Sequence, residues 1–133
     1  MENLAFNFAE SKHKGQKYGS RPYMFHVLGV AEGVPKEAKT VALLHDVLED
    51  TPTTLDELFF VTPEERLAIL AITRLKDEDY FDYIKRVKAN RLASIVKLAD
   101  LRFNLSHNPR KRNIEKYKKS INLLYKGRTG IEN

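Results

Sequence analysis

A histidine–aspartate pair, His45-Asp46, lies in an apolar stretch, and two apolar residues separate it from an acidic pair, Glu49-Asp50. A buried imidazole or carboxylate is costly unless it is paired, and a divalent cation is a partner that suits both groups. His26 and Asp100 lie in similarly apolar surroundings. The sequence therefore predicts one metal site whose ligands are His26, His45, Asp46 and Asp100.

This ligand set indicates hydrolytic chemistry. A divalent cation held by two imidazoles and two carboxylates keeps coordination positions open, and it lowers the pKa of a bound water from ~15.7 towards ~7. Mixed nitrogen and oxygen ligands suit manganese, iron, cobalt or zinc. Glu49, one turn beyond His45, is the first candidate to take the proton or align the water, and Asp50 is the second.

Helix geometry supports the grouping of these residues. His45 and Glu49, like Asp46 and Asp50, are four positions apart, so on one continuous helix each pair projects along one side. The three carboxylates crowd the C-terminal turns, where the helix dipole is already negative, and they repel one another. A bound cation would reverse that penalty.

Basic residues near these segments are candidates to bind phosphate groups. The candidates are Lys14, Lys17, Arg21 and Lys97. Asn104 lies one turn beyond Asp100 on the same side of its helix and could orient a water or bind a ligand.

Each ligand candidate also has a plain structural interpretation. Taken alone, His26 would more often be a core histidine with satisfied hydrogen bonds, and Asp100 would cap a helix or pair with Lys97. His13 and His107 lie at polar helix ends or loops, where a surface role is expected.

The elements that carry these residues are predicted to be helical throughout, because apolar residues recur at three- and four-residue spacing and sustained two-residue alternation is lacking. Pro22 suits a first helical turn, and Pro52 must end the third helix just after its acids. Hydroxyls followed by acids at Thr53-Thr54 and Thr62 predict helix starts. The predicted helices span 2–13, 22–32, 36–49, 54–60, 63–74, 79–89, 91–105 and 111–126, which makes a compact all-α bundle.

Length and composition limit the function classes. The 133 residues suit one domain spanning 1–133 with one active site, and the chain has no cysteine, so thiolate sites and disulfides are excluded. No apolar stretch approaches a membrane span, and a cytoplasmic location with no membrane partner is expected. The formal net charge of +5 is concentrated between His107 and Arg128, where eight Lys or Arg face one acid, and this favours anionic ligands.

The order His26, His45-Asp46 and Asp100 resembles the HD superfamily of metal-dependent phosphohydrolases. Four stretches are similar to the hydrolase domain of RelA/SpoT-type alarmone enzymes: HKGQ at 13–16, PYMFH at 22–26, ALLHDVLEDT at 42–51 and VKLADLRFNL at 96–105. The chain departs from that pattern at Val27, where the family usually has proline, and in a loop from Gln16 to Pro22 that is one residue short. Lys17 and Arg21 both compete for the position of a basic nucleotide-binding residue in this loop.

The resemblance implies a multi-helix HD-domain bundle with a single metal ion, typically manganese, on the four ligands. It implies that Glu49 and Asp50 lie beside the attacking water and that Asn104 lies in the pocket. The implied substrate is guanosine tetra- or pentaphosphate, which loses its 3′-pyrophosphate. Since no synthetase domain accompanies it, a stand-alone hydrolase is expected, with the number of subunits left open.

Two alternatives differ from this reading. The enzyme could be an HD phosphohydrolase of another nucleotide, such as a nucleoside monophosphate or a dinucleotide phosphate. Less favoured is a nucleic-acid-binding module with a structural metal, based on cations interleaved with aromatics in the C-terminal helix. The residues on which this alternative rests are Tyr117, Lys118, Lys119, Tyr125, Lys126 and Arg128. Against it, the tyrosines fall at helical spacing, so they are more simply explained as core residues, with the lysines on a solvated face.

Overall fold

The computed structural model describes residues 2–126, so Arg128 lies outside the described residues. The regular structure of this part is helical apart from one short hairpin, which confirms the predicted all-α class. The elements are α1 (Glu2–Lys12), β1 (Lys17–Tyr18), β2 (Arg21–Pro22), α2 (Met24–Glu32), the 3-10 helix η1 (Lys36–Ala38), α3 (Lys39–Leu44), α4 (Val47–Asp50), the 3-10 helix η2 (Leu55–Leu58), α5 (Pro63–Ile72), α6 (Tyr80–Lys88), α7 (Arg91–Ser106) and α8 (Lys111–Tyr125).

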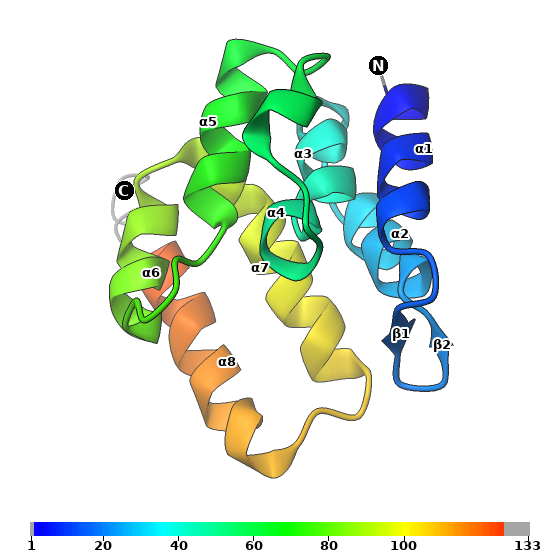
Figure 1. Ribbon diagram of the computed structural model, residues 1–133. Coiled ribbons are helices and arrows are strands. Elements are labelled where there is room, and N and C mark those ends of the chain that lie inside the picture. Colours follow the sequence, from blue (N-terminus) through cyan, green and yellow to red (C-terminus); the bar gives the residue numbers. More distant parts are fainter. Residues whose placement is uncertain (1, 127–133) are drawn as a thin grey trace.

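Helix α7 runs through the centre of the molecule (Figure 1), and α2, α3, α5, α6 and α8 pack against it. Helix α1 lies on the outside against α3. The hairpin and the N-terminal half of α8 lie on either side of the C-terminal end of α7 (Figure 1). Segments that are far apart in the sequence thus meet around one end of the central helix.

Local capping explains where several helices begin. The hydroxyl of Thr62 accepts a hydrogen bond from the Glu65 amide (3.1 Å), and the Glu65 carboxylate accepts one from the Thr62 amide (2.9 Å), with Pro63 at the first helical position. Thr54 begins η2 with the same reciprocal arrangement. Both starts were predicted, although the second opens a 3-10 helix rather than the expected α-helix over 54–60.

The predicted continuous helix over 36–49 is wrong, because its first turn is a 3-10 helix and the α-helical hydrogen bonding is interrupted at His45 and Asp46. The His45 ring nitrogen Nδ1 donates to the Ala42 carbonyl oxygen (2.6 Å), and the His45 amide also bonds to this oxygen (3.4 Å). In a continuous α-helix that carbonyl would accept from the Asp46 amide. The helix therefore ends at Leu44, and α4 starts one turn later, held by the bond from the Asp50 amide to the Asp46 carbonyl (2.9 Å).

The expectation that Pro22 opens a helix is also wrong, since Pro22 lies in β2, which pairs antiparallel with β1. A two-residue turn with Gly19 at φ 63° joins the strands, a backbone conformation that glycine adopts at little cost. Strands of two residues are too short to give an alternating pattern.

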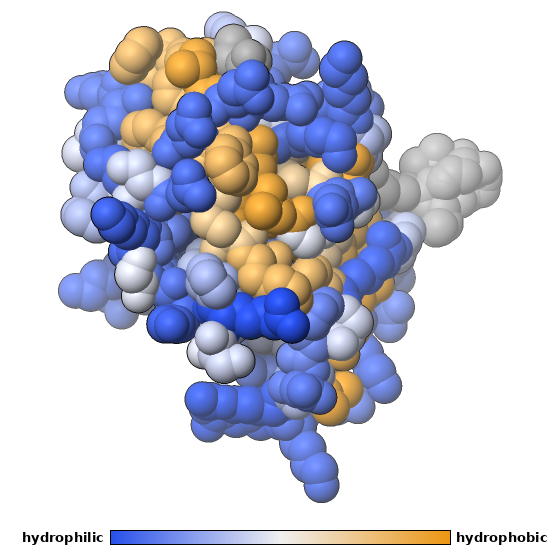
Figure 2. All heavy atoms as spheres, turned by 90° about the vertical axis from the view of Figure 1, so that its right-hand side faces the viewer, coloured by the Kyte–Doolittle hydropathy of each residue, from blue (hydrophilic) through white to orange (hydrophobic). Residues whose placement is uncertain are grey.

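Apolar side chains form a band among polar ones on the face that carries α1 (Figure 2). On the neighbouring helices α1 and α2, the exposed large apolar side chains are Leu4 and Leu28. None of the described helices is long and apolar enough to cross a membrane.

Helices α2 and α7 approach each other closely at Gly29. A Cβ atom on Gly29 would lie 2.0 Å from Cε2 of Phe103, so glycine is required for the two helices to approach this closely. The Phe103 ring in turn lies 5.1 Å, centroid to centroid, from the imidazole of His26. Phe103 therefore contacts both the α2–α7 interface and a residue of the candidate site.

Candidate functional site

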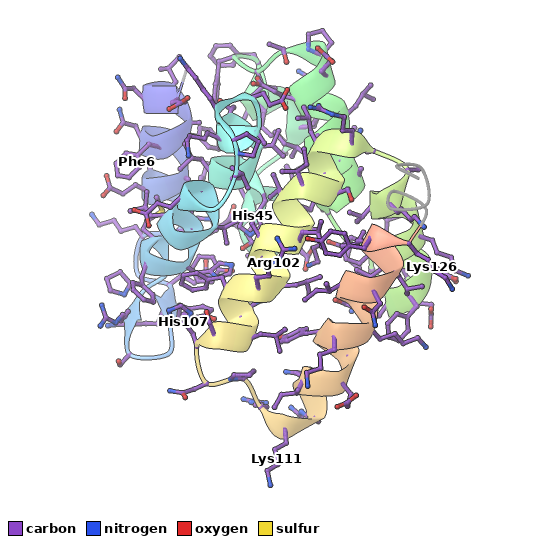
Figure 3. All side chains as sticks on the ribbon, turned by 180° about the vertical axis from the view of Figure 1, so that it is seen from behind. Phe6, His45, Arg102, His107, Lys111 and Lys126 are labelled. Atoms are coloured by element: carbon purple, nitrogen blue, oxygen red, sulfur yellow. The ribbon has the colours of Figure 1, made fainter. Side chains whose placement is uncertain are left out.

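The four predicted metal ligands converge from three segments: His26 on α2, His45 and Asp46 between α3 and α4, and Asp100 on α7. Asp100 Oδ1 lies 2.9 Å from His26 Nε2 and 3.5 Å from His45 Nε2. Asp46 Oδ2 lies 3.0 Å from His45 Nε2 and 3.7 Å from His26 Nε2. His45 is placed deep between the helices, as Figure 3 shows from behind.

His26, His45 and Asp100 bring ligand atoms within 4.8 Å of one another, a group that could hold a divalent cation, and Asp46 lies beside this group. Because Nδ1 of His45 donates to a carbonyl, Nε2 of the neutral ring presents a lone pair, and it has no hydrogen-bond partner among the described residues. A lone pair that faces two carboxylates is repelled by them, and either a proton on Nε2 or a cation between the groups relieves this repulsion. Metal–ligand bonds of about 2.1 Å separate neighbouring donor atoms by about 3.0–3.4 Å, which is close to the spacing found here.

The ionisation of the site points the same way. Burial alone would lower the pKa of the His45 imidazole, but the carboxylates of Asp46 and Asp100 raise this pKa well above its ordinary value. Burial would raise the pKa of Asp46, which His45 nevertheless holds below its usual range. The cluster therefore favours positive charge at its centre.

The Lys97 side chain is largely buried beside Asp100 and does not extend into solvent. Its Nζ donates to Asp100 Oδ2 (3.0 Å), and the two side chains are only 14% and 8% exposed. Against the effect of burial, Lys97 and the two histidines hold the pKa of Asp100 well below its ordinary value. Lys97 also lines the pocket. One oxygen of Asp100 is thus occupied by Lys97, and the other faces the imidazoles.

Glu49 and Asp50, the predicted acids, lie at the exposed end of α4 and line the same pocket. Glu49 Oε1 accepts a hydrogen bond from the backbone amide of Arg74 (2.9 Å), a partner that sequence patterns could not reveal. Burial and the neighbouring Asp46 and Glu49 raise the pKa of Asp50 to about 6.

Tyr23 is a site residue that the sequence reasoning missed as a functional group. Its hydroxyl donates to Asp46 Oδ2 (2.6 Å) and lies 3.3 Å from Asp50 Oδ2. Burial and these two carboxylates raise the pKa of Tyr23 above its ordinary value, so the hydroxyl keeps its proton. Its place in the PYMFH stretch was the only available signal.

His26, Asp46 and Asp100 line a pocket of about 830 Å³, a size typical of small-molecule sites. The hairpin, the C-terminal end of α7, the turn over 106–109 and Tyr117 of α8 line its outer part. Arg21 lines it with the guanidinium 4.4 Å from the Phe25 ring centroid, whereas Lys17 and Lys14 are exposed and lie outside the lining. The Asn104 side chain lines it too, with its oxygen accepting from the Tyr18 hydroxyl (2.7 Å).

Two histidines outside the ligand set differ in their surroundings. The predicted surface role of His13 is wrong, because this side chain is only 2% exposed, with Nδ1 2.9 Å from Gln16 Oε1. Nothing in the sequence indicated that His13 is buried, because its neighbours along the chain are polar. His107 is exposed, as expected, but its ring stacks on Phe103 (3.9 Å between centroids) and lines the pocket.

The basic helix α8 has both a buried and a solvated side. Tyr117 is half-buried and lines the pocket, but Tyr125 is 38% exposed, so the expectation that both tyrosines belong to the core holds only for the first. Lys118 and Lys119 are exposed. In Figure 3, Lys111 and Lys126 point outward from the two ends of this helix.

Comparison with known proteins identifies relatives named as guanosine-bis(diphosphate) pyrophosphohydrolases and relatives named GTP pyrophosphokinase rsh. The guanosine-3′,5′-bis(diphosphate) 3′-pyrophosphohydrolase MESH1 of Homo sapiens is 34% identical over 76% of this chain, and the protein of that name from Danio rerio is 32% identical over 74%. The chain covers 65% and 64% of the length of these relatives. The guanosine-3′,5′-bis(diphosphate) 3′-pyrophosphohydrolase of Aquifex aeolicus is 45% identical over 41% of this chain and 9% of its own. No family model matches the sequence.

A solved structure shares the fold. It is described as a metazoan orthologue of SpoT that hydrolyses ppGpp, and it superposes with a TM-score of 0.75 over 95% of this chain and 85% of that one, at 22% identity. The resemblance predicted from the motifs is therefore confirmed: the chain is related in sequence to the guanosine-bis(diphosphate) pyrophosphohydrolases and is similar in fold to a SpoT orthologue.

Proposed function

We propose that the chain is a metal-dependent hydrolase that removes the 3′-pyrophosphate of guanosine tetra- or pentaphosphate. The observation that carries the proposal is the convergence of two imidazoles and two carboxylates at the inner end of a pocket whose rim bears Glu49, Asp50 and Arg21. The relatives named for this reaction supply the substrate class.

The ligands proposed for the ion are His26, His45, Asp46 and Asp100. Among the ions that mixed nitrogen and oxygen donors suit, we propose Mn²⁺, the ion that the resemblance to the HD phosphohydrolases implies. When bound, a divalent cation lowers the pKa of a coordinated water and stabilises negative charge on a phosphate oxygen. Lys97 keeps Asp100 ionised and oriented by occupying its outer oxygen.

The remaining residues act on the proton and the substrate. Glu49 is held by the Arg74 amide through Oε1, which leaves Oε2 to accept the proton of the attacking water. Arg21 provides positive charge for a phosphate group at the hairpin, and the Asn104 side chain orients a polar group of the nucleotide. Of the two basic residues in that loop, position in the pocket favours Arg21 over Lys17.

The test is a screen of the manganese-loaded protein against phosphorylated nucleotides, with pyrophosphate and phosphate release measured separately. We expect pyrophosphate from guanosine tetraphosphate and little product from nucleoside monophosphates or dinucleotide phosphates. Release from one of those competitors instead would transfer the proposal to another nucleotide.

Metal dependence is tested with Asp46→Asn and His45→Ala. We expect both variants to lose bound metal and hydrolysis together, whereas the matched variant Asp82→Asn, at an exposed position on α6, keeps both. Metal content is measured by elemental analysis and turnover by pyrophosphate release. An active, metal-free Asp46→Asn protein would end the proposal.

A further inference from the structure

Tyr23 connects two acidic groups with different proposed tasks. It lies between the hairpin and α2, and its hydroxyl is within reach of Asp46, a proposed metal ligand, and of Asp50, the second candidate after Glu49 to align the attacking water. A phenol has one proton, so it donates to one carboxylate at a time. The distances of 2.6 Å to Asp46 and 3.3 Å to Asp50 place the stronger bond on the ligand.

The bonded oxygen is the one that faces the histidines. Asp46 Oδ2 accepts from Tyr23 and lies 3.0 Å from His45 Nε2. Rotation of the Asp46 carboxylate away from the ligand cluster would therefore break the bond to Tyr23. The hydroxyl fixes the side-chain conformation that ligation requires.

The turn that precedes the hairpin holds Tyr23 in place. The His13 ring lies 4.8 Å from the Tyr23 ring, and the Tyr23 amide donates to the Gln16 carbonyl (2.9 Å). His13 Nδ1 pairs with the Gln16 side chain, and Gly15 at φ 86° lets the chain turn between them. The HKGQ stretch, to which the proposed function gives no role, thus lies directly behind Tyr23.

We propose that Tyr23 is a positioning residue for the metal centre and that the turn of residues 13–16 is its support. The Tyr23 hydroxyl holds the Asp46 carboxylate in its ligating orientation and sets its distance from Asp50. His13 acts only through Tyr23, as the ring against which the phenol packs. This inference rests on the metal site of the proposed function.

The test is Tyr23→Phe, which keeps the ring and its packing and removes only the hydroxyl. Loss of a hydrogen bond to a metal-ligating group typically costs about 10–100-fold in metal affinity or activity, so we expect the Mn²⁺ dissociation constant to rise by about that factor. Calorimetric titration of the metal-free protein measures this without reference to turnover. At saturating Mn²⁺ we expect kcat to fall with KM nearly unchanged.

Tyr80→Phe is the matched control. It also removes a half-buried hydroxyl, which lies 3.4 Å from the Ser120 hydroxyl rather than against a carboxylate. We expect it to lower the melting temperature and to leave the Mn²⁺ dissociation constant within twofold of the parent. Equal Mn²⁺ affinities in Tyr23→Phe and the parent, or a raised KM with unchanged kcat, would overturn the positioning role.

A double-mutant cycle tests the support. We expect His13→Ala to weaken Mn²⁺ binding in the parent and to have no further effect in the Tyr23→Phe background, because the two side chains act as one unit. Additive effects would show that His13 does not act through Tyr23. If the parent itself binds no divalent metal, the proposed function fails with this inference, whereas normal binding by both parent and Tyr23→Phe overturns the inference alone.

Discussion

Gly29 offers a prediction in which two physical effects have opposite signs. Gly29→Ala lies inside α2, where alanine is favoured over glycine by about 1 kcal/mol from helix propensity. The new Cβ, however, would lie 2.0 Å from Cε2, 2.6 Å from Cδ2 and 2.8 Å from Cζ of Phe103. The ring cannot easily yield, because it also contacts the rings of Tyr18, Phe25 and His26.

Overpacking of this kind typically costs about 1–3 kcal/mol. Subtracting the propensity gain leaves a net loss of up to about 2 kcal/mol, with a middle value of about 1 kcal/mol. For a chain of 133 residues, 1 kcal/mol corresponds to about 4 °C in melting temperature. We also expect weaker Mn²⁺ binding, since displacement of Phe103 would disturb the ring of the proposed ligand His26.

Urea unfolding of four proteins measures the effect: the parent, Gly29→Ala, Phe103→Leu and the double variant. Leucine lacks the outer ring atoms, so the double variant should be more stable than the sum of the single losses predicts, by about 1 kcal/mol or more. If Gly29→Ala instead stabilises the protein by about 1 kcal/mol, the propensity expected of an open helix position, the reasoning about this close approach is refuted.

Three further predictions concern acids and surface charge. Glu49→Gln should keep Mn²⁺ and lose turnover by about 10²-fold or more, which metal analysis beside pyrophosphate release would check; full activity would exclude Glu49 as the base. Hydrogen bonds from Arg86 lower the pKa of Glu78 to about 2 from 4.5, so this pair stabilises the fold above pH 4.5 and its contribution is lost as the pH falls towards 2. Because solvent screens this pair, Glu78→Gln should cost about 1 kcal/mol at pH 7 and flatten thermal stability across that acid range, and an unchanged acid profile would contradict this. Charge reversal at Lys118 and Lys119 should barely alter turnover, and a large loss in the same assay would point to a binding role for α8.

The proposed ligands could be located from the sequence because each one interrupts an apolar pattern. His26, His45 and Asp100 lie among buried side chains, and no local bond accounts for all of their polar atoms. Helix starts at Thr54 and Thr62 were predictable for a related reason, since a cap depends on residues within three positions. Helix starts that depend on side-chain caps within three residues were therefore predicted.

Features that depend on distant or backbone partners were not predicted. The break after Leu44 arises from a bond between the His45 ring and a backbone carbonyl, and periodicity carries no trace of it. Burial of His13 depends on a ring ten residues away, and the anchor of Glu49 is the backbone amide of Arg74. The choice between Lys17 and Arg21 required the register of a hairpin too short to leave a pattern.

The proposed ligands come from α2, from the turn after α3, and from α7. The helices α2, α3 and α7 contact one another pairwise. An ion bound there would join residue 26 to residue 100 and act as a reversible cross-link within the fold, in addition to its chemical task. Whatever binds the folded chain and not the unfolded chain shifts the balance between them. Resistance to proteases would then follow the supply of that ion, so that scarcity of the metal would shorten the lifetime of the protein as well as slow its reaction.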